Sequence, residues 1–380
     1  MASQEEQPDW LDLPSDLVTI IARRSRDAVT GLAAFRSVCR AWRAAAGPAP
    51  RLLLPRVRAS HTAVFPLSRG WSLVVDTHDA SCHVSHLATR ATAALPKLNA
   101  VRDGPGSDVV RHVRYVHRND LDTALCSNWI FPTYLDFTDY LRFALHLPPG
   151  APAAVATGMT VMMYHKMHGH TGMLFCRPGD AAWTKVEKPR RIGYGYFDFA
   201  YHDGKVFGMD INGEMAVFDA ATLGALQLVP RPPDMPNLSS KMYDSICSRK
   251  QELDYVHLVA LPSKLVLVVA RTTVKSSRPV ALDLFELGSS PAPDGQLAWR
   301  KVAEAGNYEL FVDRYHATFR ENDGANGGGT RIYYVHDMKK VSTVAAYCYS
   351  MQENKLECVY RSPEDDGPPD CLTRPSWFVP

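Results

Sequence analysis

Hydrophobic residues follow two different periods along the chain, and the first period is helical. In residues 11–46, Leu17, Ile20 and Ile21 recur at spacings of three and four, which places them on one side of a helix. A second helix is predicted after Asp27, a suitable N-cap. Its apolar stripe is Leu32, Phe35, Val38, Cys39 and Trp42. So short a helical unit buries little surface alone, so it must pack on the rest of the chain or offer its apolar face to a partner.

From about residue 52 onward the period changes to two, which is typical of strands. The clearest stretch is 197–229, where apolar runs are separated by Asp203-Gly204 and by Asn212-Gly213. Both dipeptides favour tight hairpin turns, because both of their residues accept positive φ. Short successive links of this kind predict a four-stranded antiparallel meander, the shape of one propeller blade.

Similar strand sets recur along the chain and predict a ring of about six blades. A second four-strand set covers 254–302, and three strands of another cover 331–360. The gap between the third-strand segments at Cys82 and Met173 is about twice the roughly 40 to 50 residue period of a blade. We therefore expect a further unit near residues 112–147, although part of it also fits a helical period. The predicted fold is a small all-α N-terminal hairpin of two to three helices followed by an all-β propeller.

Composition narrows the classes of protein without changing the fold. The 380 residues are 46% hydrophobic and 22% charged, which excludes wholesale disorder. A net charge of +2 argues against a dedicated polyanion binder. No run approaches the roughly 18 apolar residues that span a bilayer, and the N-terminus has no secretory h-region. We therefore expect a cytoplasmic or nuclear protein whose eight scattered cysteines, with no CxxC pair, are thiols.

Candidate chemistry is sparse. Nine arginines and one acid lie between residues 21 and 60, and we interpret them as a solvated or partner-facing side of the helices, with nucleic acid disfavoured. His165, His168 and His170 have no familiar zinc-ligand spacing and indicate a surface turn instead. No nucleophile elbow, phosphate loop or HExxH helix occurs. The sequence therefore predicts no cofactor, no metal and no catalytic centre of its own.

The helical region resembles an F-box. The resemblance rests on Leu13-Pro14-Ser15-Asp16-Leu17, on Ile20-Ile21, and on the ending that runs from Phe35 to Arg43, Phe-Arg-Ser-Val-Cys-Arg-Ala-Trp-Arg. It implies docking onto a Skp-family adaptor and, through it, onto a cullin and a RING protein. The adaptor contacts that it implies are Leu13, Pro14, Leu17, Ile21, Val38, Cys39 and Trp42. One departure is Arg24-Ser25, where many members carry an apolar step.

The rest of the chain resembles the plant F-box proteins whose C-terminal region is catalogued as domain of unknown function 295, often described as kelch-like. The motifs that carry the resemblance are Gly70–Asp76, Cys176–Asp180, Gly208–Gly213, Trp299–Val302 and Pro375–Pro380. An Asn/Gly-rich loop at 322–329 departs from the family pattern. If this loop lies on the substrate face, it sets the selectivity of this member.

Together these features predict three segments: adaptor-binding helices at 10–47, a linker or first outer strand at 48–60, and a propeller at 61–380. The expected function is the non-catalytic substrate receptor of a Skp–cullin–F-box ubiquitin ligase, which holds an unknown target on its propeller. Tyr194, Tyr196 and Tyr315 are the residues first considered for target contact. The alternatives are an F-box scaffold without ligase activity and a propeller enzyme that acts on a small molecule.

Overall fold

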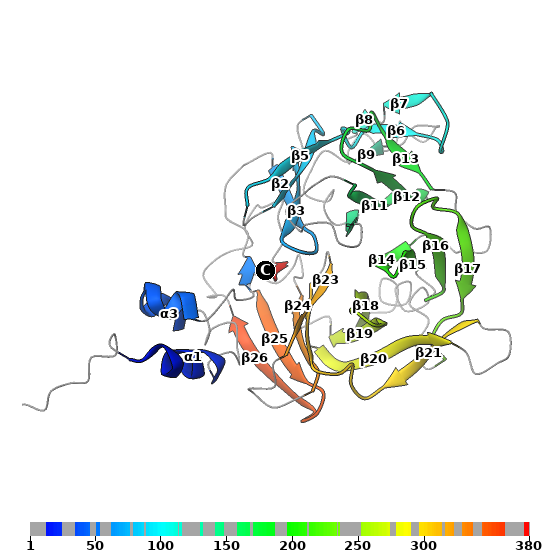
Figure 1. Ribbon diagram of the computed structural model, residues 1–380. Helices are drawn as coiled ribbons and strands as arrows, with labels where there is room; N and C mark the ends of the chain where they lie inside the picture. Colours follow the sequence, from blue (N-terminus) through cyan, green and yellow to red (C-terminus); the bar gives the residue numbers. More distant parts are fainter. Residues whose placement is uncertain are drawn as a thin grey trace, which may run out of the picture.

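The chain folds into short N-terminal helices followed by a β-propeller, as a computed structural model shows (Figure 1). The residues that the structure describes are 13–24, 35–45, 51–53, 62–76, 79–86, 89–112, 114–115, 130–131, 141–147, 158–167, 170–186, 196–210, 213–233, 235, 252–273, 279–289, 296–313, 316–322, 329–336, 344–361 and 376–379.

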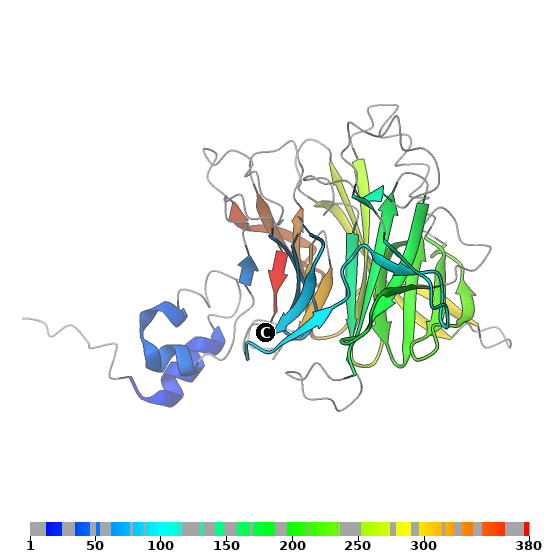
Figure 2. The same ribbon diagram turned by 90° about the horizontal axis from the view of Figure 1, so that it is seen from above.

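The helical unit contains α1 (Ser15–Arg24), a helical turn at 35–38 and α3 (Arg40–Ala45). The second predicted helix is interrupted at Cys39 rather than continuous. Figure 2 shows α1 and α3 together on one side of the ring of blades. In the described part of the chain, no helix has the length and apolar character needed to cross a membrane.

The first two blades are joined by an insertion. Blade 1 consists of β2 (Thr62–Pro66), β3 (Trp71–Asp76), β4 (Cys82–His86) and β5 (Thr92–Leu95). Blade 2 consists of β10 (Leu141–His146), β11 (Thr160–Met167), β12 (His170–Cys176) and β13 (Trp183–Lys185). Its outer edge is extended by β6 (Ala100–Arg102) and β7 (Val110–His112), with β6 parallel to β13. The insertion also contributes the parallel pair β8 (Arg114–Tyr115) and β9 (Ile130–Phe131).

The next two blades are simple antiparallel meanders. Blade 3 consists of β14 (Tyr196–His202), β15 (Lys205–Asp210), β16 (Met215–Asp219) and β17 (Ala225–Val229). Blade 4 consists of β18 (Glu252–Ala260), β19 (Leu265–Thr273), β20 (Pro279–Ser289) and β21 (Leu297–Val302). The predicted meander is confirmed, and its first turn takes the expected conformation, with φ of 44° at Asp203 and 71° at Gly204.

Blade 5 departs from the simple meander. In order across the sheet it contains β23 (Ala317–Glu321), β22 (Tyr308–Val312), β24 (Arg331–His336), β25 (Ala345–Ser350) and β26 (Lys355–Arg361). β22 pairs antiparallel with β23 and parallel with β24. After β22 the chain forms β23 at the inner edge of the sheet, and it then adds β24, β25 and β26 on the other side of β22.

The described residues form five blades, so the expectation of about six was wrong. The long gap that suggested a hidden blade separates β4 from β12, which are third strands of consecutive blades. The region 112–147 supplies only β8, β9 and the inner strand β10 among its described residues. A period count cannot distinguish an insertion between two blades from an additional blade, because both lengthen the gap by a similar amount.

The apolar core lies between the blades, as expected for a propeller. One cluster joins blades 1 and 2 and includes the buried Trp71, Phe143 and Trp183. Separate clusters join blade 2 to blade 3, blade 3 to blade 4, and blade 4 to blade 5. Each blade is therefore stabilised mainly by its neighbours in the ring.

Strand β27 (Ser376–Phe378) closes the ring by pairing antiparallel with β1 (Arg51–Leu53). The fully buried Trp377 packs edge-on against Phe311 and Tyr333 of blade 5. Its backbone N–H donates to Asp313 Oδ2 at 2.8 Å, and its indole N–H donates to the carbonyl of Val312 at 3.2 Å. Residues from the two ends of the chain therefore meet beside blade 5.

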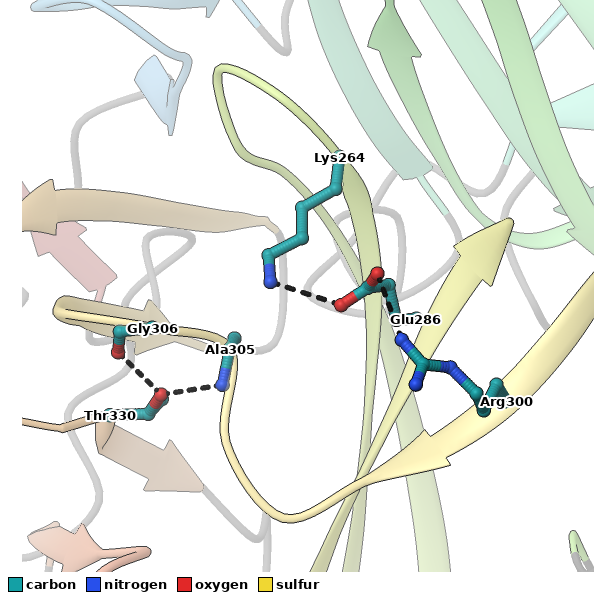
Figure 3. Close-up of polar contacts among 6 residues, drawn as sticks. All are labelled: Lys264, Glu286, Arg300, Ala305, Gly306 and Thr330. Atoms are coloured by element: carbon teal, nitrogen blue, oxygen red, sulfur yellow. Dashed lines mark hydrogen bonds and ion pairs between the residues drawn. The ribbon is translucent and has the colours of Figure 1, made fainter. Parts of the chain in front are cut away.

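Polar contacts fix the connection from blade 4 to blade 5 (Figure 3). The buried Thr330 accepts the backbone N–H of Ala305 at 2.7 Å and donates its hydroxyl to the carbonyl of Gly306 at 2.8 Å. Within blade 4, Glu286 binds Lys264 at 3.0 Å and Arg300 at 3.4 Å, which joins the β18–β19 turn to β20 and β21. These contacts join the β18–β19 turn to the outer strands of blade 4 and join the end of blade 4 to the start of β24.

Candidate functional site

The helical unit has a small apolar core of its own. Val18 and Ala22 of α1 pack with Phe35 and Trp42, and all four side chains are buried. The rings of Phe35 and Trp42 are stacked, with centroids 4.6 Å apart. This core orients α1 and α3 and leaves other apolar positions outside it.

Among the described residues of the helical unit, three large apolar side chains face solvent: Leu17 at 44%, Ile20 at 45% and Val38 at 48% exposure. Leu17 and Ile20 are three residues apart on α1 and therefore lie on the same side of the helix. A chain that used these helices only to build an internal core would bury such residues. We call Leu17, Ile20 and Val38 the exposed apolar face, which is typical of a surface that binds another protein.

The structure divides the predicted adaptor-contact residues into three groups. Leu17 and Val38 lie on the exposed apolar face, and Pro14 is also exposed. Leu13, Ile21 and Cys39 are half-buried and pack against the helical core, whereas Trp42 belongs to that core. Ile20 belonged to the predicted apolar stripe of the first helix but was not among the predicted adaptor contacts. Its spacing of three residues from Leu17 was the signal that it shares the exposed side of α1.

The segment that carries Val38 also carries arginines. Arg36 donates from its guanidinium to the carbonyl of Arg43 at 3.1 Å, and Arg43 Nε donates to the carbonyl of Arg36 at 3.1 Å. Each guanidinium therefore meets a backbone carbonyl, and no described acid pairs with Arg43. Arg40 is also exposed. The described helical unit thus combines an apolar surface with positive charge.

A second candidate site is a cavity of about 430 Å³ at the centre of the ring. Its lining comes from all five blades and from the closing strand. The turns β2–β3, β14–β15 and β18–β19 border it through Arg69, Asp203 and Pro262. Volumes of this size are typical of ligand pockets.

Asp198 on β14 is the most deeply buried acid of the cavity lining. Its Oδ1 accepts the N–H of Phe199 at 2.9 Å, and its Oδ2 accepts the N–H of Leu258, on the neighbouring blade, at 2.8 Å. Burial raises the pKa of Asp198 to about 7, against the opposite effects of these two hydrogen bonds and of the charges of Arg142 and His316. The carboxyl group thus links blades 3 and 4 while titrating near neutrality.

Two histidines near the cavity favour the neutral form. The pKa of His202 is lowered mainly by burial. The pKa of His146, whose ring lies 3.8 Å from that of Tyr201, is lowered by burial and then by the charges of Arg177 and Arg69. Arg69 is therefore the lining side chain that supplies a fixed positive charge, and Asp203 supplies an exposed negative one.

His316 and Asp313 form a structural pair rather than a reactive one. His316 Nδ1 lies 3.1 Å from Asp313 Oδ2. The Asp313 oxygens already accept the backbone N–H groups of His316 and Trp377. The pair therefore ties the turn after β22 to the closing strand. No group of three or more metal-ligating side chains occurs in the described ranges.

The structure describes almost nothing of the three tyrosines that were predicted to contact the target. Tyr194 and Tyr315 lie outside the described residues, and of Tyr196 the structure describes only the backbone, which pairs with Asp210. Sequence reasoning missed Asp198, although an acid between Phe197 and Phe199 in a buried strand was an available signal.

Comparison with known proteins agrees with the resemblance seen in the sequence. Residues 45–361 match the KIB1-4 beta-propeller family. The chain is 20% identical over 347 residues to the Arabidopsis thaliana protein named F-box protein At2g26160, a match that covers 88% of this chain and 98% of the relative.

Solved structures show only distant likeness. The beta-propeller domain of Cps50 (Swd1) from Myceliophteria thermophila shares 10% identity over 83% of this chain and 90% of its own, with a TM-score of 0.34. A chain of the Mitotic Checkpoint Complex shares 10% identity over 83% of this chain and 85% of its own, with a TM-score of 0.30.

Proposed function

This chain belongs to the KIB1-4 beta-propeller family, and we propose that it is the substrate receptor of a Skp–cullin–F-box ubiquitin ligase. In this role the helical unit docks on a Skp-family adaptor and the propeller holds a target protein. The protein itself breaks and forms no bond. It brings a target lysine close to a ubiquitin thioester on another enzyme, so that an intermolecular encounter becomes effectively intramolecular.

The exposed apolar face carries this proposal. Leu17, Ile20 and Val38 are each more than 40% exposed although α1 and α3 already have a buried core. A partner that covers them removes apolar surface from water and stabilises the complex. The name of the relative, an F-box protein, supports the same assignment. The residues 10–47 are accordingly proposed as the adaptor-binding segment.

The positive charge of the helical unit indicates an acidic partner surface. Arg36, Arg40 and Arg43 lie in the same short segment as Val38, so an adaptor with an acidic rim is electrostatically complementary. Such rim charges mainly accelerate association and make it sensitive to salt. The apolar contacts supply most of the affinity.

Capture of a purified plant Skp-family adaptor by the full chain tests the proposal, with Leu17→Arg as the disrupting variant. A charged side chain in the middle of the interface should lower the affinity at least tenfold, because a buried unpaired charge costs more than about 1.4 kcal/mol. The readout is the dissociation constant measured by calorimetry.

Leu226→Arg is the matched control. Leu226 is 57% exposed on β17, the outer strand of blade 3, so the same substitution there should leave adaptor binding unchanged. Equal binding by Leu17→Arg and the wild type, or no binding by the wild type, would contradict the proposal. If the adaptor binds but a reconstituted complex transfers no ubiquitin to a bound target, the chain is a scaffold instead.

A further inference from the structure

The helical unit and the propeller share no apolar core among the described residues. The core of the helical unit is formed by side chains of α1, of the turn at 35–38 and of α3, and the described side chains that pack against it also belong to this unit. Ala45, the last residue of α3, is one of them. Apolar packing in the described part of the chain therefore orients α1 and α3 relative to each other, but not relative to the blades.

The chain leaves the helical unit through a short connection that ends in a strand. Residues 46–50 separate Ala45 from Arg51, the first residue of β1. Two of them are Pro48 and Pro50, and the ring of a proline restricts φ. A chain of this length spans at most about 20 Å when it is fully extended. The end of α3 must therefore stay close to β1.

β1 is held in turn by the strand that closes the ring. It pairs antiparallel with β27, and Leu52 lies opposite Trp377. Trp377 is fully buried, and its two N–H groups donate to Asp313 and to the carbonyl of Val312. Figure 1 and Figure 2 both show β1, in blue, beside β27, in red, between the helices and the blades. The helical unit is thus connected to a strand that is fixed on blade 5.

Without this strand pair the connection would be much longer. The next described strand of the chain is β2, which starts at Thr62, so residues 46–61 would separate the helical unit from the propeller. A flexible chain of about 16 residues has an r.m.s. end-to-end distance of about 22 Å. Such a connection would leave the orientation of the helical unit undetermined, whereas pairing of β1 shortens it to residues 46–50.

We propose that the β1–β27 pair is the joint that holds the helical unit at a fixed distance and orientation relative to the propeller. A fixed geometry serves a receptor that acts by proximity, because the target lysine must stay near the ubiquitin thioester. This functional meaning rests on the proposed function. The joint itself is a property of the chain alone and is tested without a partner.

The test inserts the same Gly/Ser segment of about 12 residues on either side of β1. In one variant it follows Pro50, between α3 and β1, and in the other it follows Pro55, between β1 and β2. The exposed Ala44 of α3 and Ala94 of β5 are replaced by a ketone-bearing amino acid that carries a spin label, because the chain has eight cysteines of its own that would react with thiol labels. Pulsed dipolar spectroscopy then measures the distribution of distances between the two labels.

The wild type should give one narrow distance distribution. The insertion before β1 should widen it about threefold, because the connection then has roughly 17 residues and an r.m.s. length of about 23 Å. The insertion after β1 is the matched control and should leave the width unchanged, because β1 stays paired with β27 and the connection to α3 keeps its length. Thermal unfolding of each variant confirms that the propeller is intact.

Three results would overturn this inference: a broad distribution in the wild type, no widening by the insertion before β1, or equal widening by the insertion after β1. The second result would mean that the helical unit is held by contacts of its own with the propeller. Adaptor affinity is measured on the same proteins and should be unchanged by either insertion. Distance distributions that fail beside normal adaptor binding reject the joint alone, and a wild type that binds no adaptor beside the expected distributions rejects the proposed function instead.

Discussion

Two aspartates form hydrogen bonds that connect separate structural units. Asp198 accepts the backbone N–H of Leu258 on the next blade, and Asp313 accepts the backbone N–H of Trp377 on the closing strand. Both carboxyl groups are buried, so each bond is shielded from water. Single polar side chains thus connect elements that are 60 or more residues apart in sequence.

The raised pKa of Asp198 predicts a pH-dependent stability. Because its folded pKa of about 7 exceeds the unfolded value, the ionised carboxylate destabilises the folded state. The wild type should therefore lose stability as pH rises from about 4 to about 7, with little further change from this group above that. Relative to Asp198→Asn, which does not titrate, the loss should reach about 4 kcal/mol.

Urea unfolding of both proteins between about pH 4 and pH 8 measures this difference. At about pH 4 the asparagine variant should be less stable than the wild type by roughly 1 to 3 kcal/mol, because one backbone N–H loses its acceptor. Above about pH 7 the order of the two proteins should reverse, because the ionised wild type has then lost about 4 kcal/mol. A difference between the two proteins that does not change with pH, or that grows in favour of the wild type as pH rises, would contradict the assignment.

At the scale of elements, the helical unit is stabilised by few side chains. Phe35 and Trp42 supply the only aromatic rings of its described core, and they stack on each other over α1. The exposed apolar face depends on this packing, because it fixes the orientation of Leu17 and Ile20.

Phe35→Ala should therefore abolish adaptor binding by unfolding the helical unit. Truncation of a buried phenylalanine costs about 3 to 5 kcal/mol, which is more than so small a core withstands. Hydrogen exchange should show that the α1 amides lose protection while those of β19, inside blade 4, keep it.

Leu17→Arg provides the contrast, since it should weaken adaptor binding at least tenfold with the α1 amides still protected. If Phe35→Ala leaves the α1 amides protected as well, the helical unit has a source of stability other than this core.

For the whole molecule, closure of the ring is the feature that joins distant parts of the chain. β27 pairs with β1, and Trp377 contacts Phe311 and Tyr333. Blade 5 is therefore covered by Trp377 only when the two ends of the chain have paired through β1 and β27. Such non-local pairing carries a large loop-closure entropy cost.

Trp377→Ala should lower the free energy of unfolding by about 3 to 5 kcal/mol, since it removes a fully buried aromatic ring. Hydrogen exchange should increase most in β22 and β24 of blade 5. Trp299→Ala is a matched control, because Trp299 belongs to the core between blades 3 and 4 and should expose amides there. Equal exchange patterns in the two variants would show that the closing strand has no special role.

The sequence alone predicted the larger part of the fold. Strand periodicity and the Asp203-Gly204 turn predicted blade 3, and the spacing of Leu17, Ile20 and Ile21 predicted α1. Periodicity succeeded there because neighbouring residues determine both patterns. It was wrong on blade number, because the distance between β4 and β12 includes an insertion whose length carries no local signature.

The local pattern of residues therefore determined α1, most of the strands, the Asp203-Gly204 turn and the resemblance that suggests adaptor docking. Only the tertiary structure decided which apolar residues face solvent, that the ring has five blades and that its ends pair through β1 and β27. It also placed Arg69, Asp198 and Asp203 around one cavity. The reason is physical: burial, the pKa of Asp198 and the neighbours of a charge depend on blades far apart in sequence.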